Sequence, residues 1–222
     1  MTTRFESIPD TRPHDEPWPA MVWPVDPEVR LCGQLVELSL VELARDGADL
    51  FASLDDDSVW THMAKRPEGV QEYVEQLGRA LAMGVLPWVV RLRRSFRGLP
   101  AGSVVGTSSY LDVSVHDARL EVGSTAYTPA VWASAVNPET KLLLLEHAFE
   151  VLGAGRVQLK TDVRNVRSQQ AIARLGAKYE GTLRRYQRRA DGSLRDTVMF
   201  SVTAEEWPTV RDGLRARLEA PG

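Results

Sequence analysis

The stretch between residues 119 and 162 constrains the fold more than any other part of this chain. Asn137, Pro138 and Glu139 mark a helix start, because Asn is a favoured N-cap, proline suits the first helical position and an acid stabilises the first turn. The predicted helix runs to about Leu152 and ends at Gly153. It is apolar over most of its circumference, so we expect a central, buried helix.

The segments on either side of this helix read as β-strands, over residues 119–127 and 156–162. A strand, a helix and a second strand form a β-α-β unit. Such units connect through a right-handed crossover, so the two strands are predicted to be parallel neighbours in one sheet.

The rest of the chain adds elements that neither alternate strictly nor form an all-β pattern. Asp191-Gly192 is a strong hairpin-turn signal. The other elements are predicted as a strand at 29–38 interrupted by Gly33 and Gln34, helices at 41–54 and 67–84, strands at 88–92 and 104–113, a helix at 165–175, a hairpin at 183–202 and a helix after Thr203. This order predicts an α/β fold with a mixed central sheet of about seven strands, flanked by helices.

The first 27 residues differ in composition from everything that follows. Six of the 13 prolines fall there, and a residue that precedes proline is pushed away from the helical region. We therefore divide the chain into a proline-rich extended arm at 1–27 and a folded domain at 28–222. Trp18 and Trp23 indicate that the arm lies against the domain or a partner.

Composition excludes several classes of protein. The 27 Lys and Arg against 30 Asp and Glu, a net charge of −3, remove the general phosphate attraction of a nucleic-acid binder. The longest aliphatic run, 142–145, is far shorter than a membrane span. No secretory signal is evident, so a cytoplasmic location is expected.

Cysteine and histidine give no metal or disulfide signal. Cys32 stands alone and is interpreted as a buried small hydrophobe. The four histidines lack ligand spacing, and His147 is expected to be a satisfied core residue of the central helix. No metal is predicted.

From about residue 29 to 210 the chain resembles the GNAT superfamily of acyl-CoA-dependent N-acyltransferases, and within it the RimJ/RimL-like branch. The motifs that carry the resemblance are Glu121-Val122-Gly123, Trp132 through Asn137-Pro138-Glu139, His147 to Gly153, Asn165 with Ser168, Leu175-Gly176, Asp191-Gly192 and Glu206-Trp207. The resemblance implies a GNAT fold with a splayed parallel strand pair. It also implies acetyl-CoA as acyl donor and a primary amine as acceptor, attacked directly in a ternary complex.

The resemblance implies that the loop at 128–137 binds the pyrophosphate. A strand-to-helix loop presents unpaired N–H groups at the positive end of the helix dipole, which suits a phosphate, although most such loops bind only water. The family's polar and glycine positions are occupied here by Ala130, Ala133 and Ala135, which keep their amides but lose tolerance for positive φ. By resemblance, the cofactor-binding residues are Gly123, Ser124, Thr125, Trp132, Ala133, Ser134, Ala135, Val136, Asn137, Asn165 and Ser168.

Two residues are the catalytic candidates by resemblance. Glu121 matches the family's strand glutamate and is the candidate base, with a solvent-facing glutamate as the alternative. Asn165 resembles a pantetheine contact and Ser168 the proton donor to the departing thiolate, although an N-cap and an ordinary first-turn serine would look the same. Backbone N–H groups around Gly123 to Thr125 would hold the oxyanion.

Other side chains have less specific interpretations. Tyr127 and Tyr186 are alternative proton donors, and packing is the favoured reading. The arginines on the last hairpin are interpreted as a solvated face rather than as an attractor of an acidic substrate or of CoA phosphates; they are Arg184, Arg185, Arg188, Arg189 and Arg195. Asp196 is expected to be partly buried and paired with Arg185 or Arg189.

The acceptor stays open between a protein N-terminus, a polyamine, an amino acid and an antibiotic amine. The principal alternative function is a non-catalytic acyl-CoA-binding module, and a CoA-independent scaffold is a third. The sequence leaves a homodimer possible and indicates neither membrane nor general nucleic-acid binding.

Overall fold

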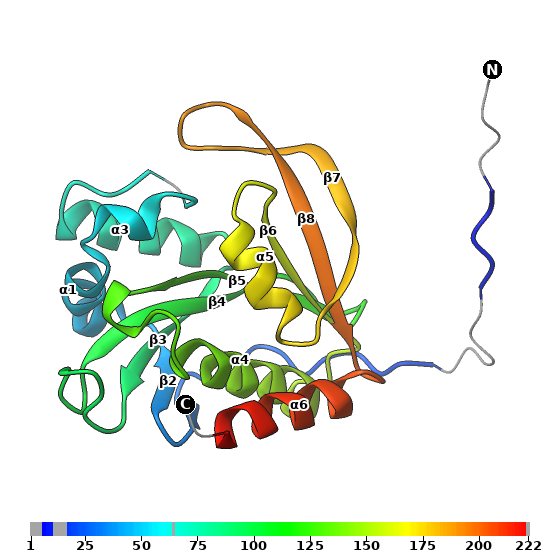
Figure 1. The fold of residues 1–222 in the computed structure, drawn as a ribbon, viewed down its shortest axis with the longest axis horizontal. Coiled ribbons are helices and arrows are strands. Elements are labelled where there is room, and N and C mark those ends of the chain that lie inside the picture. The colour runs from blue at the N-terminus through cyan, green and yellow to red at the C-terminus, as the bar shows by residue number, and fades with distance from the viewer. Residues whose placement is uncertain (1–5, 11–16, 64, 221–222) are drawn as a thin grey trace.

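The computed structural model describes residues 6–10, 17–63 and 65–220. The strands in these ranges form one eight-stranded mixed sheet in the order β1-β2-β3-β4-β5-β6-β8-β7 (Figure 1). Only β5 and β6 pair in parallel among these strands. The strands are β1 (Arg30–Cys32), β2 (Val36–Leu40), β3 (Leu86–Leu92), β4 (Val104–Ser114), β5 (Arg119–Tyr127), β6 (Arg156–Asp162), β7 (Lys178–Arg188) and β8 (Leu194–Thr203).

Helices cover both faces of the sheet, and each face has its own hydrophobic cluster. In Figure 1, α1 and α3 lie over one face and α4 and α6 over the other. The helices are α1 (Leu43–Leu54), α2 (Asp57–Trp60), α3 (Val70–Ala82), α4 (Val136–Glu146), α5 (Val166–Ala173) and α6 (Trp207–Glu219). The mixed α/β prediction is confirmed, with eight strands in place of about seven.

The central β-α-β unit is confirmed as β5, α4 and β6. Helix α4 is buried on most sides, and a π-helical turn over His147–Val151 extends it to Leu152. Asn137 is not its N-cap: the helix begins at Val136, and the Ser134 hydroxyl accepts the Val136 N–H at 3.3 Å. The cap prediction is therefore wrong: Ala135 is the N-cap residue, without a side-chain cap bond, and Asn137 already lies in the first turn.

The parallel pair opens after three residues. Arg119, Leu120 and Glu121 pair with Arg156, Val157 and Gln158, and from there the two strands separate. The β4–β5 register also shifts near Ser124, whose φ of 45° bends β5. The expected splay thus begins at Glu121, and it leaves peptide groups of both strands without a ladder partner.

The single strand predicted at 29–38 is wrong. A turn at Gly33 and Gln34 divides it into β1 and β2, because the Glu139 carboxylate inserts there and accepts the N–H groups of Gln34, Leu35 and Val36 at 2.7–2.8 Å. Cys32 is exposed and not buried, since β1 is an edge strand.

Other boundaries differ by a few residues. Helix α3 begins at Val70, three residues after Pro67, and the short α2 lies between the two predicted helices. Strand β7 begins at Lys178 and so extends the predicted hairpin toward α5. The Asp191-Gly192 turn is confirmed, with Gly192 at φ 81°.

The segment before β1 packs on the domain. The Met21 N–H donates to Val115 O and the Val22 N–H to Leu152 O, while Met21 and Val25 are buried in the core. Trp18 donates its indole N–H to Gly153 O at 3.2 Å. Residues 1–5 and 11–16 of the proposed arm lie outside the described residues.

Candidate active site

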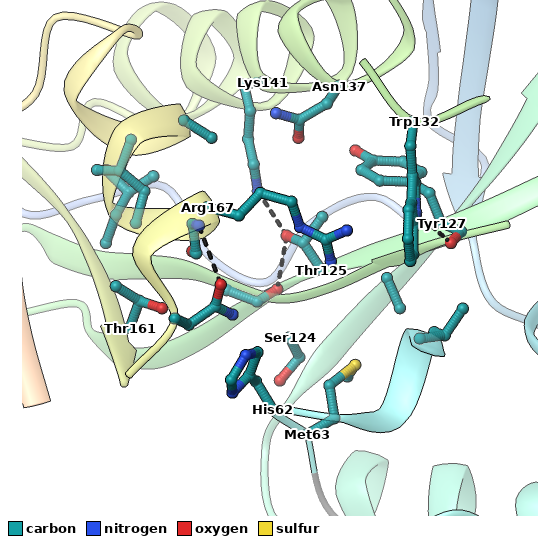
Figure 2. A pocket seen from close by; sticks show the side chains of 18 of the residues that line it. His62, Met63, Ser124, Thr125, Tyr127, Trp132, Asn137, Lys141, Thr161 and Arg167 are labelled. Carbon is teal, nitrogen blue, oxygen red and sulfur yellow. Dashed lines mark hydrogen bonds between the residues drawn. The ribbon is translucent and has the colours of Figure 1, made fainter. Parts of the chain in front are cut away.

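A cavity of about 1760 Å³ opens where β5 and β6 separate. Figure 2 shows Lys141 and Asn137 of α4 on one side of it, His62 and Met63 on the other, and Ser124 and Thr125 between them. The splay therefore makes a passage through the sheet, reached from both faces.

The loop before α4 presents free amides to this cavity. Among the described residues, the N–H groups of Ala133, Ser134, Ala135 and Asn137 have no acceptor. Ala133 adopts a φ of 51°, so alanine takes up the left-handed conformation that glycine favours. The substitutions for glycine leave the amide presentation of the loop in place.

Two arginines, which the sequence did not single out, complete the loop. Arg97 donates to Trp132 O at 2.8 Å and Ala133 O at 3.3 Å, so it ties down the carbonyls while the amides stay free. Arg167 stacks its guanidinium over the Trp132 ring at 4.0 Å, and the Trp132 indole N–H donates to Tyr127 O at 2.9 Å. Their positive charges suit an anionic ligand.

Lys141 lies deeper on the same side, hydrogen-bonded to the hydroxyls of Thr125 at 2.6 Å and Ser108 at 3.0 Å. Burial lowers the pKa of Lys141 to about 7, and the nearby charge of Glu121 only partly opposes this. A single lysine in a helix that is apolar over most of its circumference does not by itself indicate a site, so sequence reasoning missed Lys141.

Asn165 and Ser168 occupy the start of α5 beside the cavity. The Asn165 side chain accepts the Ser168 N–H at 3.0 Å, so the N-cap reading is correct for Asn165. The Ser168 hydroxyl lines the cavity and has no partner among the described residues. The cap geometry is compatible with a second role for both side chains.

Glu121 is buried and not solvent-facing, at 2% exposure. Its carboxylate accepts Lys160 Nζ at 2.7 Å and Gln158 Nε2 at 3.2 Å. The other oxygen lies against Gly123, where a Cβ would approach it to 2.7 Å. Glycine at 123 is therefore what leaves room for this carboxylate in the cavity wall.

A second ion pair joins the hairpin to β6. Arg189 donates Nε and Nη2 to Asp162 at 2.6 and 2.9 Å, and this contact lowers the pKa of Asp162 to about 2. Asp196 is half-buried as predicted, but it accepts the backbone N–H of Arg185 at 2.6 Å instead of a guanidinium.

The reading of the hairpin arginines as a solvated face is wrong for two of them. Arg189 is engaged with Asp162, and Arg195 is half-buried at the cavity. Arg184, Arg185 and Arg188 are exposed.

The tyrosines differ in environment. Tyr127 is packed in the core, and burial raises the pKa of its phenol, so it is a poor proton donor. Tyr186 is half-exposed and lies under the Lys160 ammonium at 5.7 Å from the ring centroid. His147 is buried and hydrogen-bonds Tyr110 at 3.1 Å, as expected for a core histidine.

The structure contains a splayed parallel strand pair, a helix start with free amides and a buried glutamate at the splay. The sequence itself also matches a known domain family. The family profile for the acetyltransferase (GNAT) domain matches residues 37–178. The chain belongs to the GNAT acetyltransferase family. This match confirms the superfamily part of the resemblance.

Solved structures agree with this GNAT assignment. A structure described as an acetyltransferase from T. thermophilus is 38% identical, with a TM-score of 0.75, over 89% of this chain and 100% of that chain. A GCN5-related N-acetyltransferase from Brucella melitensis is 25% identical, with a TM-score of 0.82, over 92% and 90%. Mycobacterium smegmatis RimJ in complex with CoA-disulfide shares the fold, at 23% identity and a TM-score of 0.65, over 82% and 88%. No curated protein matches the sequence.

No described helix is long and apolar enough to span a membrane. No cluster of three metal-ligating side chains occurs among residues 6–10, 17–63 and 65–220.

Proposed function

We propose that this GNAT domain transfers an acetyl group from acetyl-CoA to a primary amine, by direct attack in a ternary complex. The observation that carries the proposal is the opening of the β5–β6 ladder directly after Glu121 and Gln158. It creates unpaired strand edges beside a carboxylate, within one cavity. A thioester placed there would be reached by an amine from the opposite face of the sheet.

The residues present fit acetyl-CoA. The free amides of Ala133, Ser134 and Ala135 suit a pyrophosphate, with Arg97 and Arg167 adding positive charge. The separated edges of β5 and β6 suit the amides of pantetheine, as an added strand would pair there. Mycobacterium smegmatis RimJ, which shares this fold, was solved with CoA-disulfide.

When bound, acetyl-CoA supplies an activated acyl thioester. The amine must be neutral to attack, so a base near the splay accelerates the reaction at low pH. Glu121 has that role in this proposal, accepting the proton directly or through water. Lys160 compensates its charge and fixes its orientation at 2.7 Å. The N–H groups around Gly123 to Thr125 hold the negative carbonyl oxygen.

Ser168 serves the other half of the reaction. Its free hydroxyl lies on the same cavity as Glu121, with its backbone fixed by Asn165. It donates a hydrogen bond or a proton to the departing thiolate sulfur, while Asn165 contacts pantetheine through the amide nitrogen that the cap leaves free.

We further propose that the chain belongs to the RimJ/RimL-like branch of the family. In this proposal the catalytic domain spans 28–222 and the extended arm spans 1–27. The likeness to the mycobacterial RimJ supports the branch at the level of the fold. The acceptor is the primary amine of a small molecule or of a protein N-terminus.

Calorimetric titration with acetyl-CoA, followed by a thiol-release assay across an amine panel, tests the proposal. Binding with acetyl-CoA-dependent thiol release on at least one amine is expected. Tight binding without turnover on any amine would instead favour a non-catalytic acyl-CoA-binding module. Absence of binding would remove the donor assignment.

A further inference from the structure

The charges that line the cavity are strongly unbalanced. Among the described residues, ten lysines and arginines line it against three carboxylates. Each carboxylate is already engaged: Glu121 with Lys160, Asp162 with Arg189, and Asp191 with the Ser193 N–H. The cavity wall therefore has positive charge left over.

Arg195 is the cation at this site whose environment is least satisfied. Its Nε is completely buried and has no hydrogen-bond partner among the described residues, and it forms no ion pair with any of them. Buried donors are nearly always paired in native proteins, because an unpaired one costs its full desolvation free energy. Arg195 also lines the cavity, so the part of its guanidinium that faces the cavity is available to an anionic acceptor bound there.

The register of β6 and β8 places Arg195 on the acceptor side. Lys160 pairs with Met199 and Asp162 with Thr197, so Arg195, two residues further along β8, shares their face. Leu159 and Val198 point to the opposite face, into the cluster that contains α4. Arg195 thus belongs with Glu121 and Lys160, and not with the amides of the cofactor loop.

Electrostatics agrees with this position. Burial lowers the pKa of Arg195, and the charges of Asp162 and Glu121 oppose this only in part. Neither carboxylate offers it a hydrogen bond, since both are held by other cations. Lys160, Arg164 and Arg188 also line the cavity, so a polycationic amine would meet repulsion there.

We propose that Arg195 is an anion-recognition residue of the acceptor site, so that the preferred acceptor is a primary amine that carries a carboxylate. This inference rests on the proposed acetyltransferase function. The guanidinium pairs with a carboxylate in a bidentate manner and directs the amine toward Glu121. The carboxylate is the α-carboxylate of a free amino acid or an acidic side chain next to a peptide N-terminus.

Matched acceptor pairs test the inference on the wild-type enzyme. Amino acids are compared with their carboxamides, and peptides with aspartate at position 2 with the asparagine versions, by initial rates of thiol release. We expect kcat/KM to be about 10- to 100-fold higher for the carboxylate member of a pair, the range for a charged hydrogen bond. The two sets of pairs identify the source of the carboxylate. A preference for uncharged amines or polyamines would overturn the inference.

Variants then assign the preference to one residue. Arg195→Gln should raise KM for the carboxylate member by about 10- to 100-fold, with little change for the uncharged member. Arg195→Lys should restore part of the preference. Arg184→Gln is the matched control, because Arg184 is exposed on the same hairpin. Equal losses for both members of a pair would show a structural role for Arg195 and refute the inference.

The two proposals fail in different ways. If no amine is acetylated although the protein is folded and binds acetyl-CoA, the acetyltransferase proposal fails. If amines are acetylated without preference for a carboxylate, only the Arg195 inference fails. If Arg195→Gln does not fold, as its melting curve would show, the wild-type pairs and Arg195→Lys decide the question.

Discussion

The two sides of the β5–β6 splay hold their polar groups in opposite ways. On the α4 side, contacts are made by backbone amides, hydroxyls and Lys141, whose pKa burial lowers to about 7. On the other side, Glu121 with Lys160 and Asp162 with Arg189 form ion pairs. The α4 side relies mainly on dipoles, with Arg97 and Arg167 as cations beside them, and the other side relies on paired charges.

This difference matches the demands of the two substrates in the proposed reaction. A pyrophosphate and two amides can be bound by fixed N–H groups, which need no change of protonation. An amine that must lose a proton needs a charged partner whose protonation can respond to pH. The comparison predicts that pH will affect catalysis through one side and stability through the other.

The largest effect is expected from Glu121→Gln on the charged side. Without the carboxylate, turnover should fall about 10²- to 10⁴-fold at low pH and recover partly as pH rises, because more of the amine is then already neutral. Acetyl-CoA affinity by calorimetry should stay nearly unchanged. The exposed Glu42→Gln serves as control. A pH–rate profile identical in shape to that of the wild type would remove Glu121 as the base.

Lys141→Met, on the α4 side, should change how the free energy of unfolding depends on pH. The folded pKa is about 7 and the ordinary value is 10.5, so between these pH values the unfolded state binds one more proton. The free energy of unfolding should therefore rise with pH from 7 to 10.5, by at most about 1.4 kcal/mol per pH unit. Below pH 7 both states are protonated and the cost of burying the charge is constant.

Urea denaturation at several pH values between about 7 and 10 measures this contribution. Lys141→Met should flatten the pH dependence, whereas the exposed Lys65→Met should leave it as in the wild type. Parallel curves for wild type and Lys141→Met would show that Lys141 stays protonated in the folded protein.

Gly123→Ala tests the placement of the base without removing it. A Cβ at this position would come within 2.7 Å of a Glu121 oxygen and 3.1 Å of Leu111, so the carboxylate must move. A displacement of about 1 Å can cost about 10²-fold in turnover. Gly213→Ala in α6 is the control, because its Cβ would meet nothing within 4 Å. Unchanged turnover in Gly123→Ala would mean that catalysis does not depend on where Glu121 lies.

Ser168→Ala should lower turnover about tenfold, because it removes the hydroxyl proposed to donate to the departing thiolate. This factor corresponds to one hydrogen bond of about 1 kcal/mol or slightly more. Raising the pH should not rescue it, in contrast to Glu121→Gln. The Asn165 cap uses the Ser168 backbone N–H, so the alanine variant keeps it. A lower melting temperature with normal turnover per folded molecule would place Ser168 in the helix start alone.

Local patterns predicted the β5-α4-β6 unit, because capping, periodicity and apolar run length all act between residues 119 and 162. They indicated an interruption at Gly33 and Gln34 but not a division into two strands, since that turn is held by Glu139, which is 105 residues away from Gln34 in sequence. The ion pair of Glu121 with Lys160 was equally out of reach. It depends on the exact register of β5 with β6, and the alternation of apolar residues leaves shifts by two residues open.

The resemblance gave Glu121, Ser168 and the cofactor loop as candidates, but not Arg97, Lys141 or Arg195. Arg97 lies in the β3–β4 connection, far in sequence from the cofactor loop. Its role there follows only from the loop carbonyls that it binds. Charged residues are common in loops and hairpins, so their type alone carries little information about burial. Only the packing separates Arg195, which is half-buried, from exposed Arg184.

The smallest predicted effect concerns Ala133 in the cofactor loop. A non-glycine residue at φ 51° has a conformational cost of about 1–2 kcal/mol, which glycine avoids, while glycine loses about 0.5–1 kcal/mol in backbone entropy. Ala133→Gly should therefore raise the free energy of unfolding by somewhat under about 1 kcal/mol, measured by urea denaturation. Ala48→Gly, at an exposed position in the interior of α1, should lower it by about 1 kcal/mol. Because the N–H of residue 133 survives the change, acetyl-CoA affinity should persist. A loss of stability in Ala133→Gly would show that the loop holds alanine there without strain.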